Sequence, residues 1–423
     1  MAQTVMADEQ ATALKCGTVL DVVEQKTMTN VTLLIKGERI SAMGQDVAVP
    51  QGVRVVDLSD HYCLPGLMDM HAHMMAIDKE GKHHKGTETS AELILRALGN
   101  AQQLLQNGFT TLRIPGDVDN EFSIVKLRDA INQGVISGPR LIVAPHALQP
   151  LWGKGHFAKE HDHNHLVEAG PDAARDAVRR QVRHGADWIK VVGDEGMHPD
   201  ELLRVFTDEE MAAFADEAKA LRKKITTHAH GEHAAKVAVE AGYDSIEHGF
   251  FMSKATVREM KKKGIWLVPT LTVFDSMYDP KQMPLSAAFD IDSETRNFYQ
   301  TKWAAARQIR DETFQYAYKA GVKIAFGTDQ VMPGLATLEF AYLNRLGVTS
   351  WDAISMATIN GADLLGMKEQ LGSISEGKIA DIIALRENPL ERIEALEQVS
   401  FVMKAGATVR NDPETGGSHA TTN

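Results

Sequence analysis

The sequence predicts an α/β fold, a (β/α)8 TIM barrel with a small discontinuous β-sandwich domain built from both termini. Two observations lead to this expectation. Over the long middle region, short apolar runs alternate with longer amphipathic segments, as parallel strands that are each followed by a helix do. Both ends of the chain contain short strand-like segments punctuated by Gly, Pro and Asp, which is typical of a separate β-rich unit.

Eight apolar runs of the middle region are expected to form the barrel strands. They lie at Leu67–Met70, Thr110–Ile114, Leu141–Ala144, Trp188–Val192, Ile225–His228, Ser245–His248, Trp266–Pro269 and Ile324–Thr328. The helices expected between them include Ala91–Asn107, Pro171–His184, Asp208–Arg222, Gly231–Ala241, Lys254–Lys263 and Asp292–Ala320. Glycine commonly terminates helices, and it follows five of these segments, at Gly108, Gly185, Gly242, Gly264 and Gly321.

The barrel is expected to interrupt the smaller domain in the sequence. Residues 1–65 would form the N-terminal part of the β-sandwich, residues 66–367 the barrel, and residues 368–423 the C-terminal part and a tail. Alternating or apolar strand-like runs near the two ends, such as Val31–Ile35 and Val399–Ala405, support this division.

Composition excludes several classes of function. The chain has 423 residues and a formal net charge of −12, so it lacks the basic surface that a nucleic-acid or membrane-surface binder needs. No apolar run of about 18 residues is present, and the first residues do not resemble a signal peptide. We expect a soluble protein, either cytoplasmic or exported after removal of a signal peptide. Two cysteines cannot stabilise a chain of this length by themselves, so the core must be hydrophobic.

Two histidines at the end of the first expected barrel strand form a candidate metal-binding pair. His71 and His73 are two residues apart, and residues i and i+2 of a strand point to the same side. Active sites of barrels lie at the carboxyl ends of the strands, and imidazole is a preferred zinc ligand. The pair alone would also fit two polar residues at a strand exit.

Four further residues extend this pattern around the barrel. His228, His248 and Asp329 each end an expected strand, and Lys190 lies inside a very apolar one. An unpaired ammonium group inside a barrel is costly, so such a lysine is expected to be deprotonated, paired or covalently modified. A single histidine at a strand end is more often a packed or surface residue, so the prediction rests on the combined order of these residues.

That order, an HxH pair followed by Lys, His, His and Asp at successive strand ends, closely resembles the amidohydrolase superfamily of binuclear metallohydrolases. The resemblance covers nearly the whole chain, from LPGLMDMHAH at 64–73 to SISEGKIADIIAL at 373–385. Local motifs are similar to the branch that holds the Xaa-Pro and related metallo-carboxypeptidases and the ochratoxin-hydrolysing amidohydrolases. These motifs are DWIKVV, THAHG, IEHGFF, FGTDQ and ATINGADLLGM.

The resemblance implies a set of metal ligands. His71, His73 and Asp329 would bind the more buried of two divalent ions, expected to be Zn²⁺. His228 and His248 would bind the more exposed ion, and Lys190, carboxylated by carbon dioxide, would bridge the two. A carbamate suits this position because it supplies two anionic oxygen ligands to cations that lie about 3.5–4 Å apart. Asp329 is also expected to accept the proton of the attacking water and pass it to the leaving amine.

The resemblance also implies the reaction. The expected enzyme is a binuclear metal-dependent amidohydrolase or carboxypeptidase that hydrolyses the amide bond to a C-terminal amino acid. N-acyl amino acids, dipeptides and ochratoxin A, which would yield ochratoxin alpha and phenylalanine, fit this description. Relatives often assemble into homo-oligomers, octamers included. A cyclic-amide or imidazolone-type hydrolase or a deaminase on the same scaffold, and a non-catalytic barrel that only binds a ligand, are the alternatives.

Histidines outside the expected ligand set are candidates for substrate binding. His230 could compete with His228 as a ligand because both would point inward; we favour His228 as the ligand and assign His230 to the substrate. His146 ends another expected strand, where it would contact substrate, support a ligand or have no role. His163 and His165 lie in the segment GKGHFAKEHDHNH, which we expect to cover the barrel mouth, with a separate metal site as the alternative.

A carboxypeptidase also needs a group that binds the substrate carboxylate. Arg113, which ends an expected strand, is one candidate, and the loop that contains Lys154 is another. The alternative for this arginine is a simple ion pair with a neighbouring acid such as Asp117.

Overall fold

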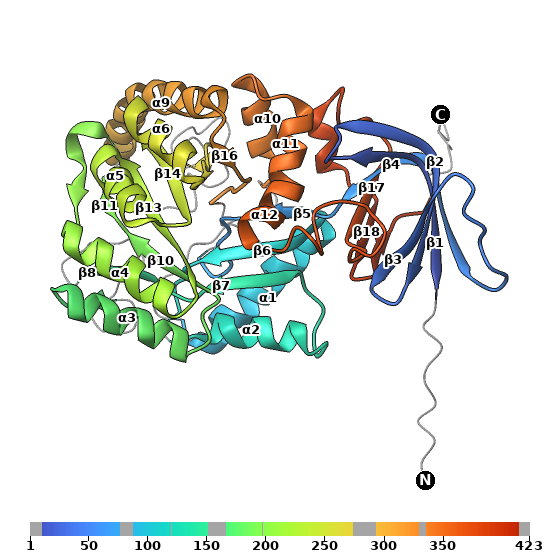
Figure 1. The fold of residues 1–423 in the computed structure, drawn as a ribbon, viewed down its shortest axis with the longest axis horizontal. Coiled ribbons are helices and arrows are strands. Elements are labelled where there is room, and N and C mark those ends of the chain that lie inside the picture. The colour runs from blue at the N-terminus through green and yellow to red at the C-terminus, as the bar shows by residue number, and fades with distance from the viewer. Residues whose placement is uncertain are drawn as a thin grey trace, which may run out of the picture.

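The computed structural model describes residues 11–76, 88–119, 121–150, 166–196, 198–273, 293–329 and 336–413. A barrel with its surrounding helices forms the larger part, and a β-sheet made from both ends of the chain lies beside it (Figure 1). The predicted α/β fold is therefore confirmed. The boundaries proposed at residues 65/66 and 367/368 stay a prediction.

The smaller part is a seven-stranded sheet in the order β19-β18-β17-β4-β1-β2-β3. Its strands are β1 (Thr12–Asp21), β2 (Lys26–Lys36), β3 (Arg39–Gly44), β4 (Arg54–Pro65), β17 (Ile382–Leu385), β18 (Phe401–Lys404) and β19 (Ala407–Asn411). Strand β17 pairs antiparallel with β4, so segments more than 300 residues apart in sequence become neighbours (Figure 1).

This sheet curls around its own apolar core. At the free edge of β3, the Ile40 N–H donates to the carbonyl of Lys378 at 2.9 Å, and Arg39 forms a bridge with Ile379, which precedes β17. Buried side chains such as Leu14, Leu33 and Phe401 fill the space that the sheet encloses. The expected β-sandwich from both termini is thus a single hydrogen-bonded sheet that closes on itself.

Eight parallel strands form the barrel, at the eight places that the sequence predicts. They are β5 (Leu67–Asp69), β6 (Phe109–Pro115), β7 (Arg140–Ala144), β10 (Trp188–Val192), β13 (Lys224–Gly231), β14 (Ser245–Phe251), β15 (Trp266–Val268) and β16 (Lys323–Ile324). Backbone hydrogen bonds join the two groups of strands. Met70 N–H donates to Phe326 O at one seam, and Asp187 N–H donates to Val143 O at the other, each at 2.8 Å.

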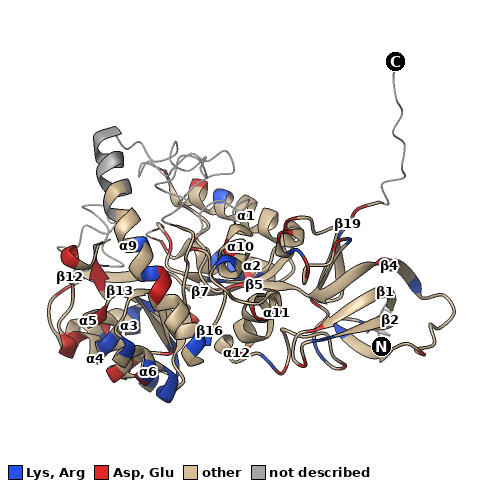
Figure 2. Cartoon of the chain, turned by 90° about the horizontal axis from the view of Figure 1, so that it is seen from above, with Lys and Arg blue, Asp and Glu red and all other residues tan. Residues whose placement is uncertain are grey.

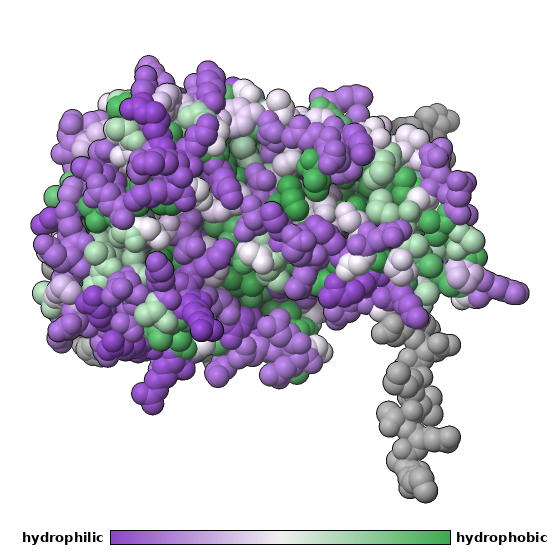
Figure 3. All heavy atoms as spheres, viewed as in Figure 1, coloured by the Kyte–Doolittle hydropathy of each residue, from purple (hydrophilic) through white to green (hydrophobic). Residues whose placement is uncertain are grey.

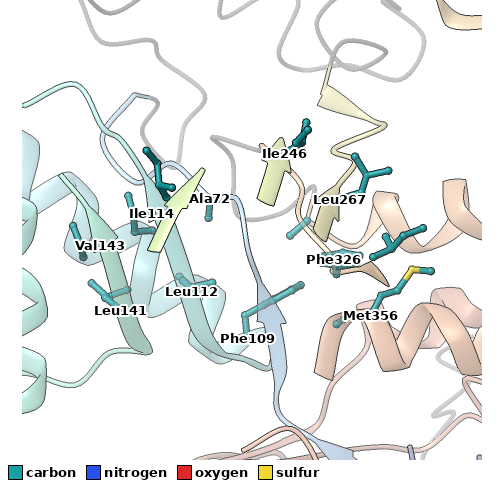
Figure 4. Packing of buried hydrophobic residues seen from close by; sticks show 14 of the residues in the cluster. Ala72, Phe109, Leu112, Ile114, Leu141, Val143, Ile246, Leu267, Phe326 and Met356 are labelled. Carbon is teal, nitrogen blue, oxygen red and sulfur yellow. The ribbon is translucent and has the colours of Figure 1, made fainter. Parts of the chain in front are cut away.

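Alternation along the strands separates the barrel interior from the layer that meets the helices. On β6, Leu112 and Ile114 belong to the large apolar cluster shared with the helices, and Figure 4 shows them beside side chains of β7. Arg113, between them, instead bonds Ser245 on the non-adjacent strand β14, so it crosses the interior. Lys190 of β10 also points into the interior, because its two neighbours along the strand belong to the outer apolar cluster.

The helices that cover the barrel match the predicted ones, with several additions. They are α1 (Ser90–Gln106), α2 (Ser123–Asn132), α3 (Pro171–Arg183), α4 (Asp208–Ala220), α5 (Glu232–Ala241), α6 (Lys254–Lys263), α9 (Ser293–Ala320), α10 (Leu338–Arg345), α11 (Ser350–Ser355) and α12 (Gly361–Leu365). The sequence gives little warning of α2, because its N-cap is Phe122 and no side chain caps it. Short strands that were not predicted are β8 (Ala147–Pro150), β9 (Leu166–Val167), β11 (Asp194–Glu195) and β12 (Leu203–Arg204).

Charged side chains of both signs lie on the outside of the molecule. Basic residues gather on α6 and acidic residues on α4 (Figure 2). The face drawn in Figure 3 is mostly hydrophilic, with apolar residues scattered over it. Among the described residues, none of the helices combines the length and the apolar composition that a membrane span requires.

A disulfide joins Cys16 of β1 to Cys63 of β4 in the core of the curled sheet. It closes a loop with a sequence separation of 47 residues, and a cross-link of this span stabilises a folded chain by about 4 kcal/mol in the chain-entropy description. We expect the double variant Cys16→Ala/Cys63→Ala to unfold at a temperature several degrees lower, as measured by calorimetry. Reductant should lower the midpoint of the wild type and leave that of the variant unchanged; two free thiols in the denatured wild type would contradict the bond.

Candidate metal centre

Side chains from both ends of the barrel sequence converge on one carboxylate. Asp329, which follows β16, has its Oδ1 atom 3.3 Å from Nε2 of His71 and 3.0 Å from Nε2 of His73. Its Oδ2 atom lies 4.0 Å from Nδ1 of His248. His71, His248 and Asp329 together have the arrangement of a candidate metal-binding group.

The protonation of the two histidines after β5 shows why a cation fits between them. Nδ1 of His71 lies 2.7 Å from Oε2 of Glu247, and Nδ1 of His73 lies 2.8 Å from the carbonyl oxygen of Gly116. Each ring must carry its proton on Nδ1 to donate to these acceptors. In the neutral rings both Nε2 lone pairs then face an oxygen of Asp329, an arrangement that only a cation or an additional proton satisfies.

The neighbouring histidines favour the ionised form of Asp329, against the effect of burial. Burial acts to raise the pKa of this carboxyl, but the charges and hydrogen bonds of His71 and His73 hold the pKa well below its usual range. Burial by itself would lower the pKa of His73, yet the adjoining Asp329 raises it. Asp329 therefore presents a negative oxygen between the Nε2 atoms of His71 and His73.

A second group of imidazoles lies beside the first. His228, His230 and His248 have ring nitrogens within 4.8 Å of one another, and the ring centroids of His228 and His248 are 4.4 Å apart. Burial and the neighbouring imidazoles lower the pKa of His228 and of His248 well below the ordinary value, so both rings are neutral, as metal ligands must be. The choice between His228 and His230 as ligand stays a prediction.

His230 also takes part in the packing of the barrel mouth. Its Nδ1 atom lies 2.7 Å from the carbonyl of Gly196, and its ring stacks on Phe250 with 4.7 Å between centroids. Asp194 accepts hydrogen bonds from the backbone of His230 and Gly231 at 2.9 and 2.8 Å. The segment after β10 thus fixes the end of β13 that carries both histidines.

Unusual backbone conformations turn some side chains inward that would point outward in a regular strand. Glu247 and His248 are consecutive on β14, yet both face the interior, because His248 has a φ of 74° and Gly249 a φ of 63°. Asp329 has a φ of 53° and donates its N–H to the carbonyl of His71 at 2.7 Å. Such conformations are uncommon for residues with a side chain and concentrate at functional sites.

Lys190 lies in the interior of the barrel with no partner among the described residues. Its side chain is 3% exposed and its Nζ atom makes no hydrogen bond there. Burial lowers the pKa of the amine to about 8, against the opposing charges of Glu247 and Asp329. An amine that loses its proton so readily can react with carbon dioxide, and a carbamate would remove the cost of an unpartnered buried amine.

Glu247 is a buried residue of the site that sequence reasoning did not single out. Its carboxylate bonds His71, Arg113, Ser245 and Thr226, and it has no exposed surface. Burial alone would raise its pKa, but Arg113 and His71 lower it far enough that the group is ionised. Its place directly before the candidate ligand His248 was the available signal.

Arg113 does not have the role predicted for it. The side chain is fully buried, and its three nitrogens bond Glu247 at 2.6 Å, the carbonyl of Met70 at 2.6 Å and Ser245 at 3.1 Å. A guanidinium with all its nitrogens used inside the barrel contradicts the binding of a substrate carboxylate. Its acidic partner is Glu247 and not Asp117, which accepts hydrogen bonds from the backbone of Met74 instead.

The structure also contradicts a substrate-binding role for His146. The ring is 1% exposed, and its nitrogens lie 2.6 Å from the carbonyl of Asp119 and 3.3 Å from the side chain of Gln181. It therefore joins the segment after β6 to α3. Lys154, His163 and His165 lie outside the described residues.

Comparison with known proteins places this site in a family context. The model of the amidohydrolase family matches residues 62–409. Ochratoxinase from Aspergillus niger is 29% identical over 416 residues, which cover 90% of this chain and 82% of that protein. The crystal structure of the A. niger ochratoxinase has a TM-score of 0.78 at 26% identity and covers 96% of both chains.

Two peptidase structures are similar over nearly the whole chain. A Xaa-Pro dipeptidase solved with methionine in its active site has a TM-score of 0.82 at 31% identity, covering 94% of this chain and 99% of its own. A prolidase solved with N-methylphosphonate-L-proline has a TM-score of 0.83 at 27% identity, covering 95% of this chain and 100% of its own.

Removal of the Glu247 charge tests whether this residue holds the site together. In Glu247→Gln the buried Arg113 loses its counter-ion, which costs about 3–5 kcal/mol of folding stability. The amide offers one acceptor oxygen where the carboxylate offered two, so the His71 ring is held less well and metal affinity falls by about 10–100-fold. Calorimetry and metal analysis after dialysis measure the two effects. Ser245→Ala, which keeps both charges, is the control and should change either quantity far less; wild-type metal retention in Glu247→Gln would contradict the orienting role.

Proposed function

The chain belongs to the amidohydrolase family and is a hydrolase, and from this premise we propose that it is a metal-dependent enzyme that cleaves the amide bond to a C-terminal amino acid. Metal ions are typical of the family, and the chain carries candidate His and Asp metal-binding groups. The observation that supports the proposal most directly is the convergence of two Nε2 lone pairs on the Asp329 carboxylate.

We propose that two divalent ions, Zn²⁺ in the first instance, occupy this centre. One would be held by His71, His73 and Asp329, whose nitrogen and oxygen atoms already converge. The other would be held by His228 and His248, whose neutral rings lie side by side. Carboxylated Lys190 would bridge the two ions, which agrees with a buried amine that lacks a partner within the described part of the barrel.

The residues of the chain would divide the catalytic work between them. Bound divalent ions would supply polarisation of the scissile carbonyl and a lower pKa for the attacking water. Asp329 is ionised at neutral pH, so its carboxylate can accept the proton of that water and pass it to the nitrogen of the departing amine. Glu247 and Gly116 hold the ring protons of His71 and His73 on Nδ1, away from the reaction.

The relatives support an amino acid on the leaving side of the bond. The Xaa-Pro dipeptidase was solved with methionine and the prolidase with N-methylphosphonate-L-proline, and ochratoxinase is one of the relatives in sequence. We propose N-acyl amino acids, dipeptides and ochratoxin A as the substrate class, with ochratoxin alpha and phenylalanine as products of the last. His230, which stacks on Phe250 at the barrel mouth, is proposed to face the substrate.

A hydrolysis screen tests the substrate class. The purified zinc-loaded protein is expected to release a free C-terminal amino acid from N-acyl amino acids, from dipeptides including Xaa-Pro, or from ochratoxin A, as identified by mass spectrometry. Cyclic amides, imidazolones and aminated heterocycles form the comparison panel. Turnover of that panel alone, with ring opening or ammonia release, would show that the proposed reaction is wrong.

Neutralisation of Asp329 tests its part in proton transfer. Asp329→Asn is expected to lower kcat by about 100-fold or more, because a general acid–base group contributes about 10²–10⁴-fold. Metal analysis must accompany the kinetics, since this residue is also a proposed ligand. Asp363→Asn, at a partly exposed acid that pairs with Lys323, should leave kcat unchanged; near-full turnover of metal-loaded Asp329→Asn would refute the role.

Carbamate formation can be followed directly. When Zn²⁺ is added back to metal-free protein, Lys190 should take up labelled carbon from [¹³C]bicarbonate. This uptake should be faster above about pH 8, because the Lys190 amine, whose pKa is lowered to about 8, is neutral there. Lys190→Ala should lose the carbon NMR signal and the second equivalent of zinc. Lys224→Ala is the matched control, since this lysine is also partly buried and its pKa is also lowered; an unchanged signal in Lys190→Ala would exclude the modification.

We also propose a homo-oligomer, by family resemblance alone. Light scattering coupled to gel filtration gives the mass that decides it.

A further inference from the structure

Thr270 connects the candidate metal centre to the end of β15. Its hydroxyl oxygen lies 2.6 Å from Nδ1 of His248, and the residue is fully buried. Thr270 also has a φ of 46°, which is a rare conformation for a β-branched residue. A strained residue in contact with a proposed ligand needs surrounding structure that holds it in place.

Glu339, the second residue of α10, holds the backbone directly after Thr270. One of its carboxylate oxygens accepts the N–H of Leu271 at 2.7 Å, and the other accepts the N–H of Thr272 at 2.9 Å and the hydroxyl of Thr272 at 2.8 Å. The carboxylate has no exposed surface. A buried bidentate acceptor of this kind sets the direction of two successive peptide units, and therefore the φ of the residue before them.

Arg310 of α9 bonds the peptide group between Leu271 and Thr272 from its other side. Its Nη1 atom donates to the carbonyl of Leu271, while Nε and Nη2 bond the carboxylate of Asp311 at 2.9 and 2.6 Å. The guanidinium is fully buried and lies over the rings of Trp303 and Tyr342. Both polar groups of Leu271 are thus tied to charged side chains on two separate helices, which leaves Thr270 little freedom to relax.

We propose that Glu339 is a positioning residue of the metal centre. Acting with Arg310, it holds Thr270 in the left-handed conformation, so that the Thr270 hydroxyl accepts the Nδ1 proton of His248 and leaves the Nε2 lone pair for a cation. This inference rests on the proposed function, because it assigns His248 as a ligand. Glu339 touches neither substrate nor cation; it acts through Thr270.

The experiment measures the ring of His248 with and without metal. Nitrogen-15 NMR of histidine-labelled, metal-free protein reports which ring nitrogen carries the proton, with His248→Gln identifying the signal. Zinc retention against a chelator reports the affinity of the two equivalents. Glu339→Gln is expected to shift or broaden the His248 signal and to weaken one zinc equivalent about 10-fold or more.

Substitutions at Thr270 separate positioning from general stabilisation. Thr270→Val removes the hydroxyl and should reproduce the effects of Glu339→Gln, while Thr270→Ser should keep wild-type behaviour. The double variant Glu339→Gln/Thr270→Val should be no worse than either single variant if Glu339 acts through Thr270. Additive losses of zinc affinity, or a wild-type His248 signal in Glu339→Gln, would overturn the proposal.

Glu210 offers a matched control because it plays a similar structural part elsewhere. This buried carboxylate at the start of α4 accepts the backbone N–H of Gly170 at 2.6 Å and of Thr207 at 2.7 Å. Glu210→Gln should lower the unfolding temperature without changing the His248 signal or the zinc affinity; a change in either would show that the assay reports stability.

Two provisions keep the outcome decisive. If Glu339→Gln does not fold, Glu339→Asp is the substitute variant. It keeps the charge beside Arg310 but is one methylene shorter and cannot reach both amides, so the same shift of the His248 signal and the same loss of zinc are expected. Wild-type behaviour of Glu339→Asp would overturn the proposal. Wild-type protein that binds no second zinc contradicts the proposed function. The metal-free nitrogen spectrum still tests the action of Glu339 on His248 in that case.

Discussion

The interior of the barrel depends on the ion pair and the hydrogen bonds of the Glu247 carboxylate. It receives hydrogen bonds from Arg113 on β6, Thr226 on β13 and Ser245 on its own strand, and it orients His71 after β5. A charge in this position is stable only because each of its lone pairs has a donor and because the arginine neutralises it. The geometry of the first candidate ligand therefore follows from the packing of the barrel beneath it.

Three residues of successive barrel segments have a positive φ. His248 lies within β14, and Thr270 and Asp329 follow β15 and β16. Neighbouring acids hold two of these turns: Asp69 accepts the Thr328 hydroxyl at 2.6 Å beside Asp329, and Glu339 holds the amides after Thr270. The candidate metal centre thus lies where the chain departs from regular strand geometry, and buried carboxylates stabilise two of these departures.

The same scaffold serves enzymes with different substrates, so the barrel alone does not define the reaction. Similarity to ochratoxinase and to a prolidase extends over the barrel and the curled sheet alike, which supports amide hydrolysis as the reaction class. What distinguishes one substrate from another must lie in the side chains around the barrel mouth.

Local patterns in the sequence were sufficient for the barrel strands, most of the helices and the β-rich unit of both termini, because periodicity and glycine stops act over a few residues. Position placed the candidate ligand residues at one edge of the barrel, since the carboxyl ends of parallel strands meet there, and the family resemblance implied their assignment as ligands, which stays a prediction. Only the tertiary structure decided the roles of Arg113, His146 and Glu247. Whether a buried polar side chain faces a substrate or another side chain depends on contacts between strands that are far apart in the chain, and no spacing in the sequence records those contacts.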